Sequence, residues 1–141
     1  MQFILDTDHV SLILRGDSRI QSVIKTKQNV CTSIITAQEL FNGWVVRINN
    51  AKPSDNFVVL YADFCDSINY LKKTEILSFN EFADVRFRQL LQEHPSLRKA
   101  RLQRDMRIAA IALSLNATVV TCNRRDFEQV PGLKIDDWTV P

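Results

Sequence analysis

An apolar run in the last third of the chain limits the possible folds most. Met106 to Leu115 is rich in Ala, and its only charge is at its second position, so we predict a helix with Asn116 as its C-cap. Asp105 lies one turn before Ala109 and two turns before Ala112. The carboxylate therefore shares a helix face with small side chains that allow close packing on a sheet.

A buried strand follows this helix and ends in polar residues. Thr118 to Thr121 has two valines at its centre, and the polar turn after it contains Asn123 and Asp126. Ligand sites in open α/β sheets collect at the carboxyl ends of parallel strands. We therefore expect Thr121, Asn123 and Asp126 to lie beside a functional site, with Asp105 at the start of the neighbouring helix.

Two earlier strands also end at acidic residues. Asp6 follows the strand Phe3 to Leu5, and Glu39 lies in the first turn of a helix after the strand Val30 to Ser33. Both residues have a purely structural alternative. Asp6 can be the N-cap of the next helix, and Thr36 with Glu39 has the spacing of a capping box.

The other predicted elements alternate in the same way. We predict a helix from Asp55 to about Lys73, capped by Ser54, and then a strand from Ile76 to Phe79. A helix from Phe82 to about His94, capped by Asn80, follows. The last predicted strand is Leu133 to Ile135. This order predicts one α/β domain over residues 1–141, a sandwich built on a mostly parallel sheet.

Composition excludes several classes of protein. Only three glycines occur, far apart, so no glycine-rich phosphate loop can form. Three cysteines without CxxC spacing and two isolated histidines form no disulfide framework and no zinc pattern. Asp6 and Asp8 interrupt the only apolar stretch at the amino terminus, which argues against a signal peptide or membrane span. We expect a cytoplasmic protein that does not bind membranes.

The three carboxylates Asp6, Glu39 and Asp105 predict a metal site. Such a group repels itself unless a cation is bound, and oxygen ligands without His or Cys select Mg²⁺ or Mn²⁺. Basic residues surround the site, which favours a phosphate-rich substrate, although a solvated helix face is the alternative. They are Arg98, Lys99, Arg101, Arg104, Arg107, Arg124 and Arg125.

Four segments together resemble the PIN-domain ribonucleases, specifically the VapC-type toxins of bacterial toxin–antitoxin pairs. They are ILDTDHV, SIITAQEL, RDMRIAAIAL and VVTCNRRDFEQVPGLKIDDW, and they extend over nearly the full length. The resemblance implies a PIN-like three-layer sandwich whose central, mostly parallel sheet has four to five short strands. It further implies Mg²⁺-dependent endonucleolytic cleavage of RNA, a homodimer, neutralisation by a VapB antitoxin in a larger hetero-oligomer, and DNA contact only through that antitoxin.

The same resemblance assigns roles to individual residues. Asp6 and Asp105 would be principal metal ligands, with Glu39 binding directly or through water. The fourth acidic position of the family falls on Asn123, and Asp126 lies three residues later, so either could complete the site. Thr121 would help to orient the phosphate or the water around the metal. The RNA backbone would be bound by Arg98, Lys99, Arg101, Arg104, Arg124 and Arg125.

Two other readings remain open from the sequence. A haloacid-dehalogenase-type phosphatase would use Asp6 as nucleophile with Asp8 beside it, and Asp136 with Asp137 could supply its later acidic pair. A catalytically silent PIN-fold interaction module would keep the fold without the metal. The first reading leaves Glu39 and the RDMRIAAIAL helix unexplained, and the intact carboxylates argue against the second.

Overall fold

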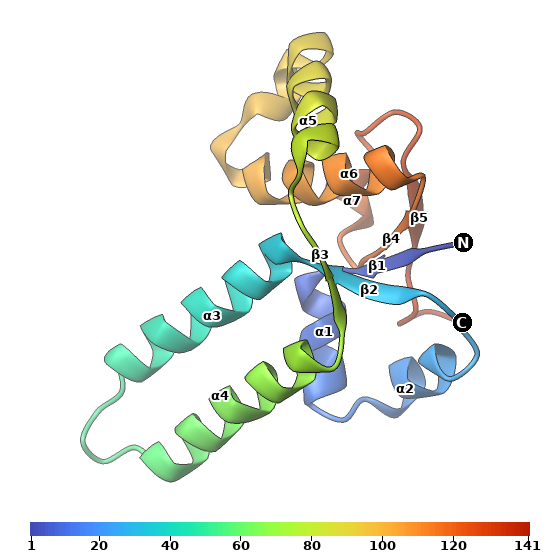
Figure 1. The fold of residues 1–141 in the computed structure, drawn as a ribbon. Helices are drawn as coiled ribbons and strands as arrows, with labels where there is room; N and C mark the ends of the chain where they lie inside the picture. Colours follow the sequence, from blue (N-terminus) through green and yellow to red (C-terminus); the bar gives the residue numbers. More distant parts are fainter.

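A parallel five-stranded sheet forms the centre of the computed structural model, which describes residues 1–141 (Figure 1). Its strand order is β3-β2-β1-β4-β5, and every neighbouring pair is parallel. The strands are β1 (Phe3–Leu5), β2 (Val30–Ser33), β3 (Glu75–Leu77), β4 (Thr118–Val120) and β5 (Lys134–Asp136). The prediction of a mostly parallel sheet of four to five strands is confirmed.

Helices cover both faces of the sheet and complete the expected three layers (Figure 1). They are α1 (Thr7–Leu14), α2 (Ser18–Ile24), α3 (Ile34–Asn49), α4 (Phe57–Lys72), α5 (Glu81–Glu93), α6 (Gln103–Leu115) and α7 (Arg124–Phe127), with short 3₁₀ turns at Pro95–Arg98 and Ala100–Leu102. None of these helices has the length and apolar character needed to cross a membrane.

The two sides of the sheet have separate cores. Ile4 and Val119 pack into a cluster formed mainly with α5 and α6, where Ala109 and Ala112 are fully buried. Phe3, Leu5 and Val120 face the opposite side of the sheet, where they pack against α1, α3 and the C-terminal Trp138. Alternate residues of a strand point to opposite faces, so a three-residue strand can serve both cores. The predicted close packing of α6 on the sheet is confirmed.

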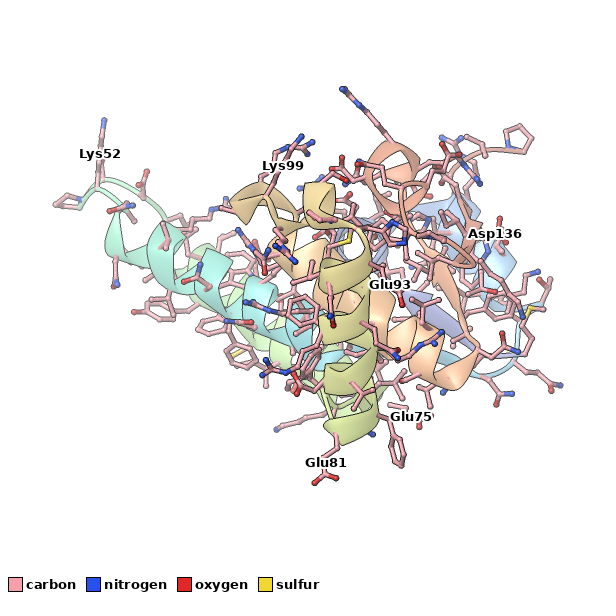
Figure 2. All side chains as sticks on the ribbon, turned by 90° about the horizontal axis from the view of Figure 1, so that it is seen from above. Lys52, Glu75, Glu81, Glu93, Lys99 and Asp136 are labelled. Carbon is pink, nitrogen blue, oxygen red and sulfur yellow. The ribbon has the colours of Figure 1, made fainter.

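Helices α3 and α4 form a hairpin that extends away from the sheet, with Lys52 in the loop at its tip (Figures 1 and 2). The predicted start of the second helix at Asp55, with Ser54 as its cap, is wrong. Asn56 is the N-cap, its side chain accepts from the backbone N–H of Val59, and the helix begins at Phe57. Asn can cap a helix as well as Ser does.

Strand β1 is the point at which the order of strand addition reverses. The chain runs from β1 outward through β2 to β3, then returns to place β4 on the other side of β1. In sheets of this topology a crevice opens at the carboxyl ends of the strands beside that switch. Asp6 and Thr121 are the residues that follow β1 and β4 directly.

Candidate metal centre

Asp6 is buried at the end of β1 and has both carboxylate oxygens engaged. Oδ1 accepts from the backbone N–H of His9 at 3.2 Å, and Oδ2 accepts from the hydroxyl of Thr121. The capping role foreseen as a structural alternative therefore exists. It does not exclude metal binding, because each carboxylate oxygen keeps a further lone pair.

Glu39 reaches the same edge of the sheet from α3. Its Oε1 accepts from the Thr7 hydroxyl at 3.0 Å, and its Oε2 pairs with Arg104 at 3.3 Å. The predicted capping box of Thr36 and Glu39 is wrong. Ser33 is the N-cap of α3, and its hydroxyl accepts from the Thr36 backbone N–H at 3.2 Å, because the helix starts directly where β2 ends.

Asp105 lies in the first turn of α6, as predicted, and is surrounded by other negative charges. Burial is the main cause that raises its pKa from 3.8 to about 6, and the negative charges of Glu39, Asp126, Asp6 and Asp8 contribute to the same rise in that order. Burial, and then the charge of Asp6, also raises the pKa of Asp8. The carboxylates at this sheet edge therefore repel one another.

Asn123 joins two carboxylates of the cluster. Its side-chain amide Nδ2 donates to Asp105 Oδ2 and to Asp126 Oδ2, each at 3.0 Å. Asp126 also accepts from Arg101 at 3.1 and 3.2 Å. The hydrogen bond from Asn123, supported by Arg101, lowers the pKa of Asp126. Asp126 is thus partly neutralised, whereas Asp105 has no cationic partner.

The basic residues expected to bind RNA divide into two groups. Four are held by other parts of the chain: Arg101 by Asp126, Arg104 by Glu39, Arg124 by Glu128 at 3.5 Å, and Arg98 by the carbonyl of Leu91 at 2.9 Å. Lys99 and Arg125 are exposed and form no ion pair. All four arginines remain largely accessible, so their pairing does not exclude phosphate binding.

The sequence did not identify two residues that contact this site. Thr7 donates to Glu39, and the buried ring of His9 lies with Nδ1 3.5 Å from Asp6 Oδ1. The available signal was their position in the Asp6-Thr7-Asp8-His9 run, one helical turn from the first carboxylate. His94, in contrast, caps the end of α5, as expected for a helix-end residue.

The geometry gives no support to the phosphatase alternative. Asp8 forms no ion pair, and no lysine pairs with any carboxylate of the cluster. Asp136 and Asp137 are instead used in the C-terminal segment, where they accept from Trp138 Nε1 and from Thr139. Both residues thus take part in contacts of the C-terminal segment, and no contact joins them to Asp6.

Comparison with known proteins places the chain among PIN domains, since residues 3–133 match that family. The tRNA(fMet)-specific endonuclease VapC of Salmonella typhimurium is 27% identical over 141 residues, 98% of each chain, and ribonuclease VapC2 of Haemophilus influenzae is 26% identical over the same share.

Solved structures agree on the fold. VapBC2 of Rickettsia felis bound to a promoter DNA fragment superposes with a TM-score of 0.79 at 20% identity, covering 98% of this chain and 99% of the other. DNA-bound VapBC of Salmonella typhimurium gives 0.77 at 25% identity and 98% of each chain. With its parallel sheet, its cluster of carboxylates beside the end of β1 and this match over nearly its whole length, the chain belongs to the PIN domain family.

Proposed function

We propose that this chain is a metal-dependent endoribonuclease, the toxin of a VapBC-type pair, which acts on RNA in the cytoplasm. The observation that carries the proposal is the convergence of Asp6, Glu39 and Asp105 at the switch point of the sheet. Asp105 there has no cationic partner, and its pKa is raised to about 6. A cluster of carboxylates in which Asp105 has no cationic partner is a site for a divalent cation.

The donor set fits Mg²⁺, with Mn²⁺ as its substitute, because every donor is an oxygen. Asp6, Asp105 and Glu39 would hold the ion. When bound, the ion would activate water and stabilise negative charge on the phosphodiester. Nε2 of His9, the histidine next to Asp6, already accepts a backbone hydrogen bond from Trp138, so this nitrogen does not favour zinc over these metals.

Other residues of the chain would hold these ligands in place. Thr121 fixes one oxygen of Asp6, and Thr7 with Arg104 fixes both oxygens of Glu39. Asn123 holds Asp105 toward the turn and is the better candidate for the fourth site position, because it contacts Asp105 directly. Asp126 would support that turn through Asn123 and Arg101.

RNA would approach this edge of the sheet along the basic residues that surround it. Lys99 and Arg125 are free to pair with phosphates, and Arg104 lies beside the carboxylate of Glu39. An RNA backbone is a polyanion, and its binding to a mixed acidic and basic surface depends on such lysines and arginines. Arg98, Arg101 and Arg124 would extend the same surface.

The catalytic proposal is tested by cleavage of single-stranded RNA with the purified protein. EDTA should abolish cleavage and Mg²⁺ should restore it, while Asp6→Asn should be inactive but folded. Asp84→Asn is the matched control, because Asp84 is a carboxylate of α5 that pairs with Arg88 instead. Cleavage that persists after exhaustive chelation, or an Asp6→Asn variant with parental activity, would refute the proposal.

A protein partner would cover part of the exposed apolar surface on the α3–α4 hairpin. The side chains involved include Val46, Val58 and Tyr61, which are 50%, 80% and 55% exposed. Such a surface is typical of protein interfaces. A VapB-type antitoxin and a second copy of the chain are the partners we propose. Co-expression of a VapB-type antitoxin with this chain should relieve toxicity and yield a stable complex, and sedimentation of the isolated chain should give a dimer.

A further inference from the structure

His9 is a fully buried histidine that the proposed reaction does not yet use. Its ring belongs to α1, one turn after Asp6, and it contacts the C-terminal segment, which is 129 residues away in sequence. The backbone N–H of Trp138 donates to His9 Nε2 at 3.1 Å. A buried polar ring that is held this firmly needs a reason, because an apolar side chain could fill the same space.

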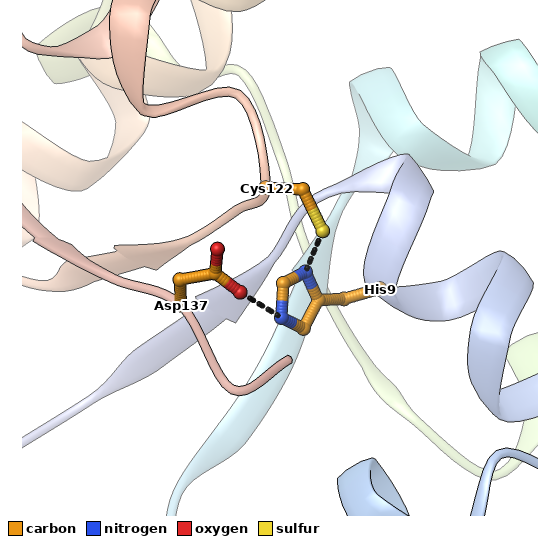
Figure 3. A group of neighbouring side chains, drawn as sticks. All are labelled: His9, Cys122 and Asp137. Atoms are coloured by element: carbon orange, nitrogen blue, oxygen red, sulfur yellow. Dashed lines mark hydrogen bonds and ion pairs between the residues drawn. The ribbon is translucent and has the colours of Figure 1, made fainter. Parts of the chain in front are cut away.

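The contact with Trp138 decides which ring nitrogen carries the proton. A nitrogen that accepts a hydrogen bond has no hydrogen, so the neutral ring of His9 is protonated at Nδ1. Nδ1 lies 3.5 Å from Asp6 Oδ1. It also lies 3.8 Å from the sulfur of Cys122, a contact drawn in Figure 3. The Nδ1–H therefore lies between two acceptors, the sulfur of Cys122 and the carboxylate of Asp6.

We infer that His9 is a positioning residue for Asp6, anchored by the Trp138 backbone and directing its Nδ1–H toward the carboxylate that would bind the metal. The inference rests on the proposed metal-dependent function. A lysine or arginine here would cancel the charge of Asp6, whereas a neutral ring orients the carboxylate and leaves its charge available. Partners of this kind, which hold a ligand without touching the metal, tune metal affinity in many proteins.

Trp138, which anchors this arrangement, is itself held by hydrogen bonds and packing. Trp138 is buried, its indole Nε1 donates to Asp136 Oδ2 at 3.0 Å, and its ring packs on Phe3 with centroids 5.4 Å apart. The backbone N–H of Thr139 donates to Asp137 Oδ1 at 2.9 Å, which holds the turn that follows Trp138. The segment after β5 thus fixes the ring of His9, and the ring in turn fixes Asp6.

The neighbouring Cys122 and Asp137 suggest a second reading, a metal site of their own with His9. Their ligand atoms lie within 4.8 Å of one another. In Figure 3, however, the ring lies between the two side chains, with Cys122 beside Nδ1 and Asp137 beside Nε2. Because the Nε2 lone pair already accepts from Trp138, the ring has no free lone pair for an ion. The geometry therefore favours the positioning role.

Two substitutions separate the two ends of the ring. His9→Asn places an amide near the position of Nδ1 and keeps a donor toward Asp6, whereas His9→Gln places its amide near Nε2 and keeps only an acceptor for Trp138. Mn²⁺ binding is measured by electron paramagnetic resonance, alongside metal-free melting. His9→Gln should weaken Mn²⁺ binding about tenfold or more, and His9→Asn should stay within about threefold of the parent. His94→Asn, at the end of α5, is the control and should bind as the parent does.

Equal Mn²⁺ affinity in the parent and in both variants would overturn the inference. Equal losses that follow the drop in melting temperature would also overturn it, because they would indicate a merely structural role. If the parent cleaves RNA with Mg²⁺ while His9→Gln retains its affinity, only the role of His9 fails. If the parent neither binds Mn²⁺ nor cleaves RNA, the proposed function fails as well.

Nitrogen-15 NMR of the parent tests the same inference without any variant, so a variant that fails to fold does not block the test. The expected spectrum has a protonated Nδ1 and an unprotonated Nε2 for His9, and added Mg²⁺ should shift the Nδ1–H signal. A proton on Nε2 would overturn the inference. Stoichiometric Zn²⁺ binding that disappears in Cys122→Ser would do the same, in favour of the separate metal site.

Discussion

The side-chain amide of Asn123 lies 3.0 Å from Asp105 Oδ2 and 3.0 Å from Asp126 Oδ2, so one neutral donor joins two carboxylates. Asp105 is the carboxylate with a raised pKa, and Asp126 is the one whose pKa is lowered. A donor at this point reduces the repulsion between them. Asn123 therefore has a physical role that an Asp at the same position could not perform in the metal-free protein.

Replacing Asn123 with Asp should destabilise the metal-free protein. It should also increase the stabilisation that Mg²⁺ brings. The change removes two hydrogen bonds to carboxylates and adds a negative charge between them, at a cost of about 2 kcal/mol in the free energy of unfolding. Urea denaturation with EDTA and with Mg²⁺ measures both effects. Asn123→Ala, which loses the donors without adding charge, is the control and should gain no more from Mg²⁺ than the parent does. Equal metal-free stability of Asn123→Asp and Asn123→Ala would show that Asp105 and Asp126 do not repel the added charge.

Replacing Asp126 with Ala should be milder than replacing Asp105. Asp126 is held by Asn123 and Arg101 and supports the turn, so its loss should cost about 1 kcal/mol and only part of the turnover. Asp105→Ala should remove cleavage entirely. Single-turnover rates on one RNA substrate compare the two. Complete inactivation by Asp126→Ala, with Asn123→Ala still active, would make Asp126 the fourth residue of the metal site.

The acidic cluster could be predicted from the sequence because the ends of strands and the positions of residues on the helices beside them are local features. Asp6, Glu39 and Asp105 each stand next to a short apolar run, and a parallel sheet brings such positions to one edge. The contacts among side chains could not be predicted in this way. Arg104 meets Glu39 across 65 residues and Trp138 meets His9 across 129, and no periodic pattern encodes such pairs.

Helix starts were predicted less well than helices for a related reason. Polar residues that can cap occur in groups, as at Ser54, Asp55 and Asn56, and the packing of the helix selects one of them. Thr36 likewise has a capping spacing with Glu39, but Ser33 caps the helix because β2 leads into it without a loop. The error moved two helix boundaries without changing the fold.

Replacing Asp105 with Asn should stabilise the metal-free protein at neutral pH. The pKa of Asp105 is raised above its ordinary value, so the folded state holds the proton more tightly than the unfolded state, and stability falls as pH rises from about 4 to 6. Asn removes that loss. The gain should be near zero at pH 4 and about 1 kcal/mol above pH 7, a value reduced for solvent screening of a partly exposed group.

Thermal or urea unfolding in EDTA across this pH range measures the difference between Asp105→Asn and the parent. Asp84→Asn is the control, since Asp84 is partly exposed and paired with Arg88 at 2.9 Å, and it should bring no gain at neutral pH. A stability difference between Asp105→Asn and the parent that is constant with pH would mean that the pKa of Asp105 is not raised in the folded protein. A variant that is inactive yet more stable would be typical of a functional site.

Cleavage should rise with pH through about 6 when Mg²⁺ is below saturation. Asp105 must lose its proton before it can bind a cation, and its pKa lies at about 6. Because the ion competes with the proton for the same carboxylate, raising Mg²⁺ should move the inflection of the pH profile to lower pH. Rates measured at two Mg²⁺ concentrations test this, and an inflection that does not move would assign it to another group.

The basic residues should differ in how strongly they contribute to RNA binding. Lys99 and Arg125 have no partner in the chain and should release counterions fully when they meet phosphates. Replacing both with Ala should reduce the slope of log affinity against log salt by about 1.4, at about 0.7 for each contact with a single strand. Arg101→Ala should change the slope less, because its guanidinium already pairs with Asp126. Lys52→Ala, at the tip of the α3–α4 hairpin, is the control (Figure 2). A slope that is unchanged in the double variant would show that Lys99 and Arg125 face solvent and do not contact RNA.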